Sequence, residues 1–237
     1  MLVLFDIDGT MLHSLSAGVH AMTSTLSDLH GIVPDFSRIE IHGRLDTLIW
    51  RDLAKVHGYP TDDASHAVFK RSYGEHLERR LADNNTVERF RGAKELVDAT
   101  RAVDGLTIGL LTGNYEFTGN LKVRHAGIDP AHFIVNAWGD DGPDRRSLVP
   151  VAMRRYAEHH GRPVAPRDVI IIGDTPADVD CAHASGARVI AVATGHFDID
   201  ALRAAGADLA VHDLSDTQKL LQWITLPHDQ RVEMRYG

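Results

Sequence analysis

The chain opens with the stretch LVLFDIDGT, residues 2–10, in which four apolar residues lead directly into an Asp-Ile-Asp-Gly-Thr motif. An apolar run this short is typical of a strand buried inside a sheet, and the Gly-Thr pair marks a turn at its end. Because residues two apart in an extended chain face the same way, Asp6 and Asp8 are expected to point into one site. Two such carboxylates can bind a divalent cation, while one attacks phosphorus and the other handles a leaving-group proton. Gly9 permits a tight turn where a phosphate approaches backbone N–H groups.

Two alternatives apply to this motif. An EF-hand loop needs acidic ligands at its first and twelfth positions around a glycine at the sixth, and aligning Gly9 with that glycine puts Leu4 and Leu15 there. A calcium-binding loop is therefore excluded. An acidic turn with a purely structural role stays open.

A second apolar run, at 106–111, leads into Thr112, Gly113 and Asn114. The threonine hydroxyl and the turn amides can hydrogen-bond phosphate oxygens, although Thr-Gly is also an ordinary way for a strand to end.

A third apolar run, at 169–172, delivers Asp174 to its carboxyl end. Because parallel strands end at one edge of a sheet, this carboxylate is expected to converge with Asp6 and Asp8 on one cation. Asp178 lies four residues further on, in the first turn of a predicted helix, where capping and function are equally open.

The pattern of apolar residues divides the chain into a core and an insert. Between residues 14 and 91 apolar residues recur every three or four positions, which predicts helices over 16–30, 45–57 and 63–81, with a weak strand at 39–41. From residue 92 helices alternate with strands: helices at 93–102, 117–125, 148–160, 176–185, 199–205 and 216–224, and strands at 106–111, 133–135, 169–172, 189–192 and 209–211. This alternation predicts an α/β fold with a Rossmann-like parallel sheet and helices on both of its faces. We expect a core domain of residues 1–13 and 92–226, an all-helical cap domain of residues 14–91 over the carboxyl ends of the strands, and a polar tail at 227–237.

Composition narrows the function further. The formal net charge is −8, which disfavours a nucleic-acid binder but permits a small anionic substrate. The single cysteine, Cys181, rules out an internal disulfide and is expected to be a small core residue. None of the 15 histidines forms an HExxH motif. No apolar run approaches the roughly 18 residues needed to cross a bilayer, and the N-terminus does not resemble a signal peptide. We therefore expect a cytoplasmic protein with no nucleic-acid or membrane partner.

Taken together, DIDGT, LLTGN and GDTPAD resemble the motifs of the haloacid dehalogenase superfamily of phosphohydrolases. The chain resembles the branch with a helical cap inserted after the first motif, which includes phosphoglycolate phosphatases and β-phosphoglucomutases. The resemblance extends from Leu2 to about Ile224.

The resemblance implies a role for each matching residue. Asp6 matches the nucleophile that becomes a phosphoaspartate, and Asp8 matches the general acid–base that also lends its backbone carbonyl to Mg²⁺. Thr112 matches the phosphate-binding hydroxyl, Asp174 the metal-binding carboxylate and Asp178 a carboxylate behind it.

The surrounding residues of these motifs are expected to bind phosphate: Gly9, Thr10, Gly113 and Asn114.

One family feature is missing. The family usually places a lysine between the threonine strand and the last acidic motif, and here no lysine lies between Lys122 and Asp174. Lys122 is expected to sit in the middle of a helix, badly placed for this role. Arg145 is the expected replacement, with Arg146 the alternative, because an arginine can neutralise phosphate oxygens in a bidentate manner.

Arg44, at the entry to a predicted cap helix, is a candidate for binding an anionic part of the substrate. The alternative is a surface arginine that balances Asp46.

The resulting hypothesis is a Mg²⁺-dependent phosphatase that hydrolyses a small phosphorylated metabolite. A phosphosugar mutase of the same fold and a catalytically inactive binding protein are the alternatives. Phosphoglycolate, a sugar phosphate and a nucleotide monophosphate all fit as substrates, and either a monomer or a homodimer is compatible with the sequence.

Overall fold

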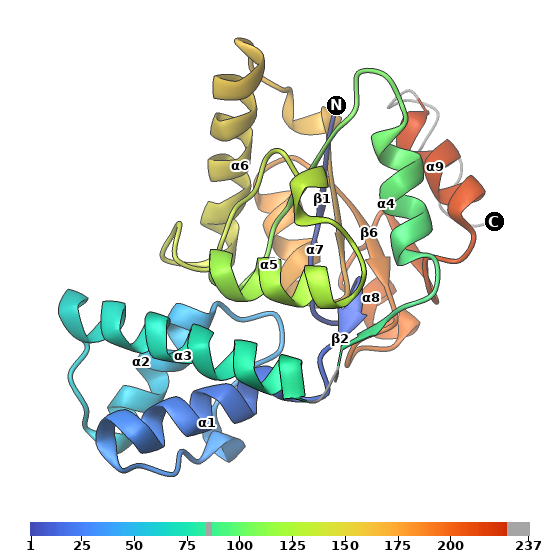
Figure 1. Ribbon diagram of the computed structural model, residues 1–237. Coiled ribbons are helices and arrows are strands. Elements are labelled where there is room, and N and C mark those ends of the chain that lie inside the picture. Colours follow the sequence, from blue (N-terminus) through green and yellow to red (C-terminus); the bar gives the residue numbers. More distant parts are fainter. Residues whose placement is uncertain (84–86, 227–237) are drawn as a thin grey trace.

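The computed structural model describes residues 1–83 and 87–226, and its centre is a five-stranded sheet (Figure 1). The strand order is β4-β1-β5-β6-β7, and every pairing is parallel. The strands are β1 (Leu2–Phe5), β4 (Thr107–Leu110), β5 (Val169–Gly173), β6 (Arg188–Val192) and β7 (Leu209–Val211). The first four are buried along their whole length, as expected for strands covered on both faces.

Helices cover both faces of this sheet because alternate strand residues point to opposite sides. Val3 and Phe5 of β1 pack with α4 (Ala93–Arg101) and α9 (Thr217–Thr225) on one face. Leu2 and Leu4 pack with α6 (Arg145–His160) and α7 (Pro176–Ala184) on the other. The remaining core helices are α5 (Glu116–His125) and α8 (Ile199–Ala204), with 3₁₀ turns at Pro130–His132 and Pro166–Asp168. The predicted α/β class is therefore confirmed.

Three helices form the cap and lie together beyond the carboxyl ends of the strands (Figure 1): α1 (Ala17–His30), α2 (Asp46–His57) and α3 (Asp63–Asp83), with a 3₁₀ turn at Phe36–Arg38. Helices α1 and α3 pack against each other along their lengths. Their buried residues meet an aromatic group in which Phe69 lies 5.7 Å from Trp50 and 5.8 Å from Tyr73 between ring centroids. The apolar interior of the cap is continuous with one of the two apolar clusters of the core.

The chain enters and leaves the cap through a small antiparallel pair, β2 (Leu12–His13) and β3 (Glu88–Arg89). This pair was not predicted, because two-residue strands are too short to show a periodicity.

Two predicted strands are wrong. Residues 39–41 form no strand; Ile39 and Ile41 instead pack in an irregular segment against the core. Residues 133–135 run beside β4, and the Ile134 N–H donates to Ile108 O at 3.0 Å. However, the side chain of Asn136 accepts the N–H of Leu110 at 2.9 Å, so a side chain interrupts the backbone ladder and only a bridge at Ala137 follows.

Two further comparisons concern the ends of elements. Helix α6 begins at Arg145, earlier than the predicted 148, because Asp144 and Ser147 form a capping box. The predicted tail at 227–237 lies outside the described residues. Among the helices that the structure describes, none combines the length and apolarity needed to cross a membrane.

Gly109 in β4 offers a test of this packing. A Cβ atom there would lie 1.5 Å from the backbone oxygen of Val135, so Gly109→Ala must displace the neighbouring chain. We expect a loss of about 2 kcal/mol or more in the free energy of unfolding, measured by urea denaturation. Gly105→Ala is the control, because its Cβ would meet nothing within 4 Å and only its φ of +79° carries a cost, about 1 kcal/mol. Equal losses in the two variants would contradict the close approach at β4.

Candidate active site

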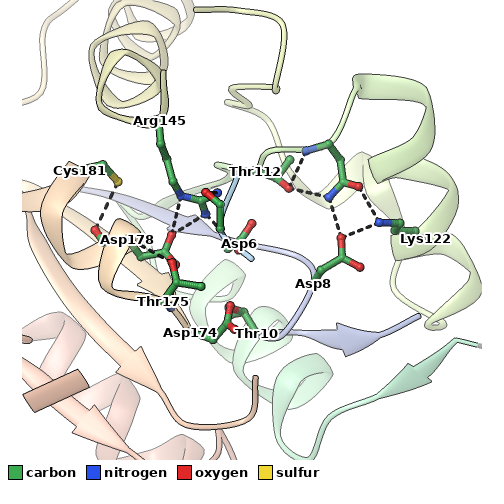
Figure 2. A network of polar contacts seen from close by, with 12 residues as sticks. Asp6, Asp8, Thr10, Thr112, Lys122, Arg145, Asp174, Thr175, Asp178 and Cys181 are labelled. Carbon is green, nitrogen blue, oxygen red and sulfur yellow. Dashed lines mark hydrogen bonds and ion pairs between the residues drawn. The ribbon is translucent and has the colours of Figure 1, made fainter. Parts of the chain in front are cut away.

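The carboxyl ends of β1, β4 and β5 meet beneath the cap and line a cavity of about 440 Å³. Asp6 follows β1 and is held by its N–H, which donates to Ile172 O of β5 at 2.8 Å. Thr112 and Asp174 follow β4 and β5 and also line the cavity. The structure therefore brings together three side chains that the sequence analysis placed at one sheet edge (Figure 2).

Arg145 connects two of the buried carboxylates (Figure 2). Its Nη2 lies 3.0 Å from Asp6 Oδ2 and 2.5 Å from Asp178 Oδ1, and its Nε donates to the same Asp178 oxygen at 3.0 Å. A buried guanidinium between two carboxylates offsets their repulsion and orients Asp6. Arg146 instead pairs with Asp180 on the exposed surface, so Arg145 is the arginine that faces the cavity.

The donor set fits a hard divalent cation. Carboxylate oxygens of Asp6, Asp174 and Asp178 lie within 4.8 Å of one another, and all three residues are buried. Asp178 is already committed, because it accepts hydrogen bonds from Arg145, from the Thr175 N–H at 3.0 Å and from the Thr175 hydroxyl at 2.7 Å. The residues that could hold a divalent cation directly are thus Asp6 and Asp174, with Asp178 behind them.

The pKa values of the clustered carboxyl groups also favour a cation site. Burial raises the pKa of Asp6 to about 7, in spite of the opposing charge of Arg145. Burial, with the charges of Asp6 and Asp178, raises the pKa of Asp174 well above its ordinary value. Such carboxylates need a positive charge in order to ionise, which a divalent cation would supply.

The backbone approaches Asp174 closely on two sides. A Cβ atom at Gly9 would lie 2.2 Å from an Asp174 carboxylate oxygen, and one at Gly195 would lie 1.8 Å from it. Glycine at both positions is what leaves room for this carboxylate.

Thr10 differs from its expected phosphate-binding role, because it does not line the cavity and its hydroxyl donates to Asp174 Oδ1 at 3.1 Å.

Asp8 lines the same cavity but has a separate set of partners (Figure 2). Its carboxylate accepts hydrogen bonds from Lys122 Nζ at 2.6 Å, Asn114 Nδ2 at 2.8 Å and Ser14 Oγ at 3.1 Å. Burial would raise the pKa of Asp8, but the charge and hydrogen bonds of these partners outweigh it and hold the pKa below its ordinary value. The three carboxylates that cluster are therefore those of Asp6, Asp174 and Asp178, and not that of Asp8.

The position of Lys122 corrects the sequence analysis. It lies in the middle of α5 as expected, yet its side chain reaches the cavity, where Nζ contacts Asp8 and donates to Asn114 Oδ1 at 2.7 Å. The site therefore contains two buried cations, Arg145 beside Asp6 and Lys122 beside Asp8.

The remaining predicted residues occupy the walls of the cavity. Thr112, Gly113 and Asn114 all line it, and Thr112 Oγ1 accepts from Asn114 Nδ2 at 2.8 Å. Arg44 also lines it, but its guanidinium pairs with Asp52 and not with Asp46.

Cys181 is fully buried, as expected of a small core residue, and burial raises the pKa of its thiol to about 12.

The cap closes on the site through specific contacts. The Asp46 N–H donates to Gly113 O at 2.8 Å, and the Thr47 hydroxyl donates to Gly139 O at 3.0 Å. At the cavity wall, the His42 ring of the cap stacks on the His196 ring of the core, with 4.5 Å between the ring centroids. The first turn of α2 is thereby attached to the end of β4.

The chain thus has a parallel α/β core that carries buried carboxylates and a paired arginine at its carboxyl edge, beneath a helical insert. The chain belongs to the haloacid dehalogenase-like hydrolase family, whose model matches residues 3–192.

Individual relatives agree with this assignment. The chain is 28% identical over 229 residues to the phosphoglycolate phosphatase of Chromobacterium violaceum, with 93% of this chain and 96% of the relative covered. Among solved structures, CbbY from Rhodobacter sphaeroides in complex with phosphate matches with a TM-score of 0.71 at 17% identity, covering 91% of this chain and 95% of that one. A hydrolase from Pseudomonas syringae matches with a TM-score of 0.68 at 22% identity, covering 95% and 100%. The two structures share the fold with this chain.

Binding of Mg²⁺ is expected to release protons near pH 7. The pKa of Asp6 is raised to about 7 and that of Asp174 above its ordinary value, so the pair is partly protonated over this range without metal, and a cation requires the ionised forms. Affinity should therefore fall as pH is lowered from 8 to 6. Titration calorimetry in two buffers of different ionisation enthalpy should show release of about one proton per Mg²⁺. Asp174→Asn should weaken binding, and a heat that does not depend on the buffer would contradict this view of the cluster.

Proposed function

We propose that this protein is a Mg²⁺-dependent phosphatase that hydrolyses a small-molecule phosphate monoester through a phosphoaspartate on Asp6. The observation that carries the proposal is the position of Asp6, a buried carboxylate between the Arg145 guanidinium at 3.0 Å and the Asp174 carboxylate. The relatives named phosphoglycolate phosphatases, from Chromobacterium violaceum and from Rhodospirillum rubrum at 27% identity, support it. Residues 14–91 are proposed to act as the cap domain that excludes water from this site.

Mg²⁺, held by the carboxylates of Asp6 and Asp174 and, by family resemblance, by the Asp8 carbonyl, would neutralise charge on the phosphate and on the nucleophile. Phosphate oxygens would also accept hydrogen bonds from the Thr112 hydroxyl and the N–H groups of the adjoining turns.

The reaction proceeds in two displacements. A carboxylate oxygen of Asp6 attacks phosphorus in line, the bond to the ester oxygen breaks, and the leaving oxygen takes a proton from Asp8. Asp8, now ionised, accepts a proton from a water molecule whose oxygen attacks the same phosphorus, and the bond to Asp6 breaks. The products are the alcohol and inorganic phosphate, and both aspartates return to their starting states.

Lys122 can change the pKa of Asp8 during these two displacements. In the described structure its ammonium holds Asp8 ionised, which suits the second displacement but opposes the first. A substrate phosphate would compete for the ammonium, and if Lys122 turned toward it, Asp8 would lose the charge that lowers its pKa, and that pKa would rise. Substrate binding thereby prepares Asp8 to donate its proton.

The function is tested by phosphate release from a panel of small phosphate monoesters, with and without Mg²⁺. Wild type should turn over, and Asp6→Asn should lose about 10³-fold or more in kcat because the nucleophile is absent. Asp200→Asn, a change at an exposed residue of α8, is the matched control. Absence of turnover on every ester by folded, Mg²⁺-loaded wild type would overturn the proposal. Conversion between glucose phosphates without phosphate release would replace it with a mutase.

The role of Lys122 is tested by Lys122→Met. Because burial is then opposed by hydrogen bonds alone, the pKa of Asp8 should rise, and the fall of kcat/KM at high pH should move upward by about one pH unit or more. Lys122→Arg keeps the charge and should restore most of the wild-type profile. An unchanged profile in Lys122→Met would show that this ammonium does not control Asp8.

A further inference from the structure

The cavity continues from the phosphate-binding end into the cap, where helices of both domains form its wall. Gly18 of α1 and Tyr73 of α3 line it from the cap, and Lys122 of α5 lines it from the core. Helix α3 packs against both α1 and α5 (Figure 1). This part of the wall is therefore complete only while the cap is closed on the core.

Gly18 leaves a notch in this wall. The residue is partly exposed. A Cβ atom built on it would have, beyond its own part of α1, two heavy atoms of the described residues within 4 Å: Tyr73 Oη at 3.1 Å and Lys122 Nζ at 3.8 Å. The Gly18 notch is thus open on the cavity side and bordered by two polar groups.

The first of these groups, the Tyr73 hydroxyl, is unpaired. Tyr73 is only 1% exposed, and within residues 1–83 and 87–226 its hydroxyl has no hydrogen-bond partner. The hydroxyl of a buried tyrosine usually has one. Burial, with the charges of Asp46 and Asp8, raises the pKa of Tyr73 well above its ordinary value, so the hydroxyl keeps its proton and is available as a donor.

Lys122 brings a second donor to the notch. An ammonium has three N–H groups, and Lys122 uses two of them on Asp8 Oδ2 at 2.6 Å and on Asn114 Oδ1 at 2.7 Å. In the part of the chain that the structure describes, no acceptor meets the third. A group that meets two donors must itself accept, which fits the oxygen of a hydroxyl or a carboxylate and not a methyl or an ammonium group.

The charges of the surrounding wall are mixed. Lys122 and Arg44 are positive, and Asp8 and Asp46 are the carboxyl groups that line the same cavity. Asp8 carries a proton when the leaving group departs in the proposed reaction, and burial raises the pKa of Asp46 to about 7. A neutral hydroxyl and a carboxylate can therefore both occupy the notch, and the ability to accept hydrogen bonds decides which groups fit.

The notch also lies close to the bond that breaks. In the proposed reaction Asp8 donates its proton to the leaving oxygen, and Lys122 Nζ lies 2.6 Å from Asp8 Oδ2. Atoms of the leaving group that are a few bonds from the ester oxygen are therefore the ones that come near Nζ and the notch.

We propose that the Tyr73 hydroxyl and the third N–H of Lys122 bind an oxygen of the leaving group in the Gly18 notch. The substrates are then phosphate monoesters that carry a hydroxyl or carboxylate oxygen on the second or third carbon. Because both domains contribute to the notch, a leaving group that fits it also favours the closed cap. This inference rests on the proposed phosphatase function and adds residues that select its substrate.

Two series of esters test the inference. The two-carbon series differs only in the group on the second carbon: ethyl phosphate, 2-hydroxyethyl phosphate, phosphoglycolate and O-phosphoethanolamine. The three-carbon pair is n-propyl phosphate and glycerol 3-phosphate. In at least one series, wild type should favour an oxygen-bearing ester over its alkyl counterpart by about tenfold or more in kcat/KM. The ammonium of O-phosphoethanolamine should bring no such gain.

Two variants remove the notch in different ways. Tyr73→Phe deletes the hydroxyl and should bring the ratio of oxygen-bearing to alkyl ester close to one. Gly18→Ala should also lower the ratio, because its Cβ would lie 3.1 Å from Tyr73 Oη, whereas alanine inside a helix favours the fold. A general loss of folding would slow all esters alike, so the ratio reports on the notch.

Tyr59→Phe is the matched control. It deletes another cap hydroxyl, which donates to Trp50 O at 2.7 Å and does not line the cavity. It should lower the melting temperature and leave the ratio unchanged.

The outcomes separate the two proposals. An equal preference for alkyl and oxygen-bearing esters in wild type would overturn the role of the notch, as would a preference for the ammonium ester. So would a ratio that Tyr73→Phe or Gly18→Ala leaves intact. In each of these cases hydrolysis of p-nitrophenyl phosphate would leave the phosphatase function standing. Absence of turnover on p-nitrophenyl phosphate and on every ester of both series would refute the phosphatase, and the inference with it.

Discussion

Repulsion among buried carboxylates is the constraint around which this site is built. Asp6, Asp174 and Asp178 lie in one cluster with oxygens within 4.8 Å of one another, and all three residues are buried. Arg145 balances part of that charge through Asp6 and Asp178, and Thr10 and Thr175 donate hydrogen bonds to the rest. The sheet order places β1 between β4 and β5, so the same topology that buries the strands forces these charges together. A cation is the natural complement of such a cluster.

Much of the fold was predictable, because it follows from local patterns. The strands that became β1, β5, β6 and β7 are short apolar runs, and the periodic helices of the cap appear within a few residues of their expected ends. The wrong predictions concern segments whose structure is determined by contacts between residues that are distant in sequence. Residues 133–135 have strand composition, but the side chain of Asn136 takes a bond of the ladder.

For the site, the strand-end residues were predictable and the partners across elements were not. Asp6, Thr112 and Asp174 are marked by the strands that deliver them. Lys122 was misjudged, since a lysine inside a helix is ordinarily solvated. A signal was present: Thr118 and Lys122 lie four residues apart, which is helical spacing, and both are on the buried face of α5. The burial of Asp46 depends on how the cap meets β4, which no local pattern encodes.

The pairing of β2 with β3 also bears on how the chain reaches its native state. Strand β1 must find partners far along the chain, with Leu2 opposite Thr107 and Val169. Closing loops of this length costs entropy and slows folding. A cap that folds early, with its two ends joined where Leu12 pairs with Arg89, removes most of that first loop from the search. The joined ends of the insert then hold β1 close to the chain that leads into β4. A segment that interrupts the core domain in sequence would in this way help the core domain to fold.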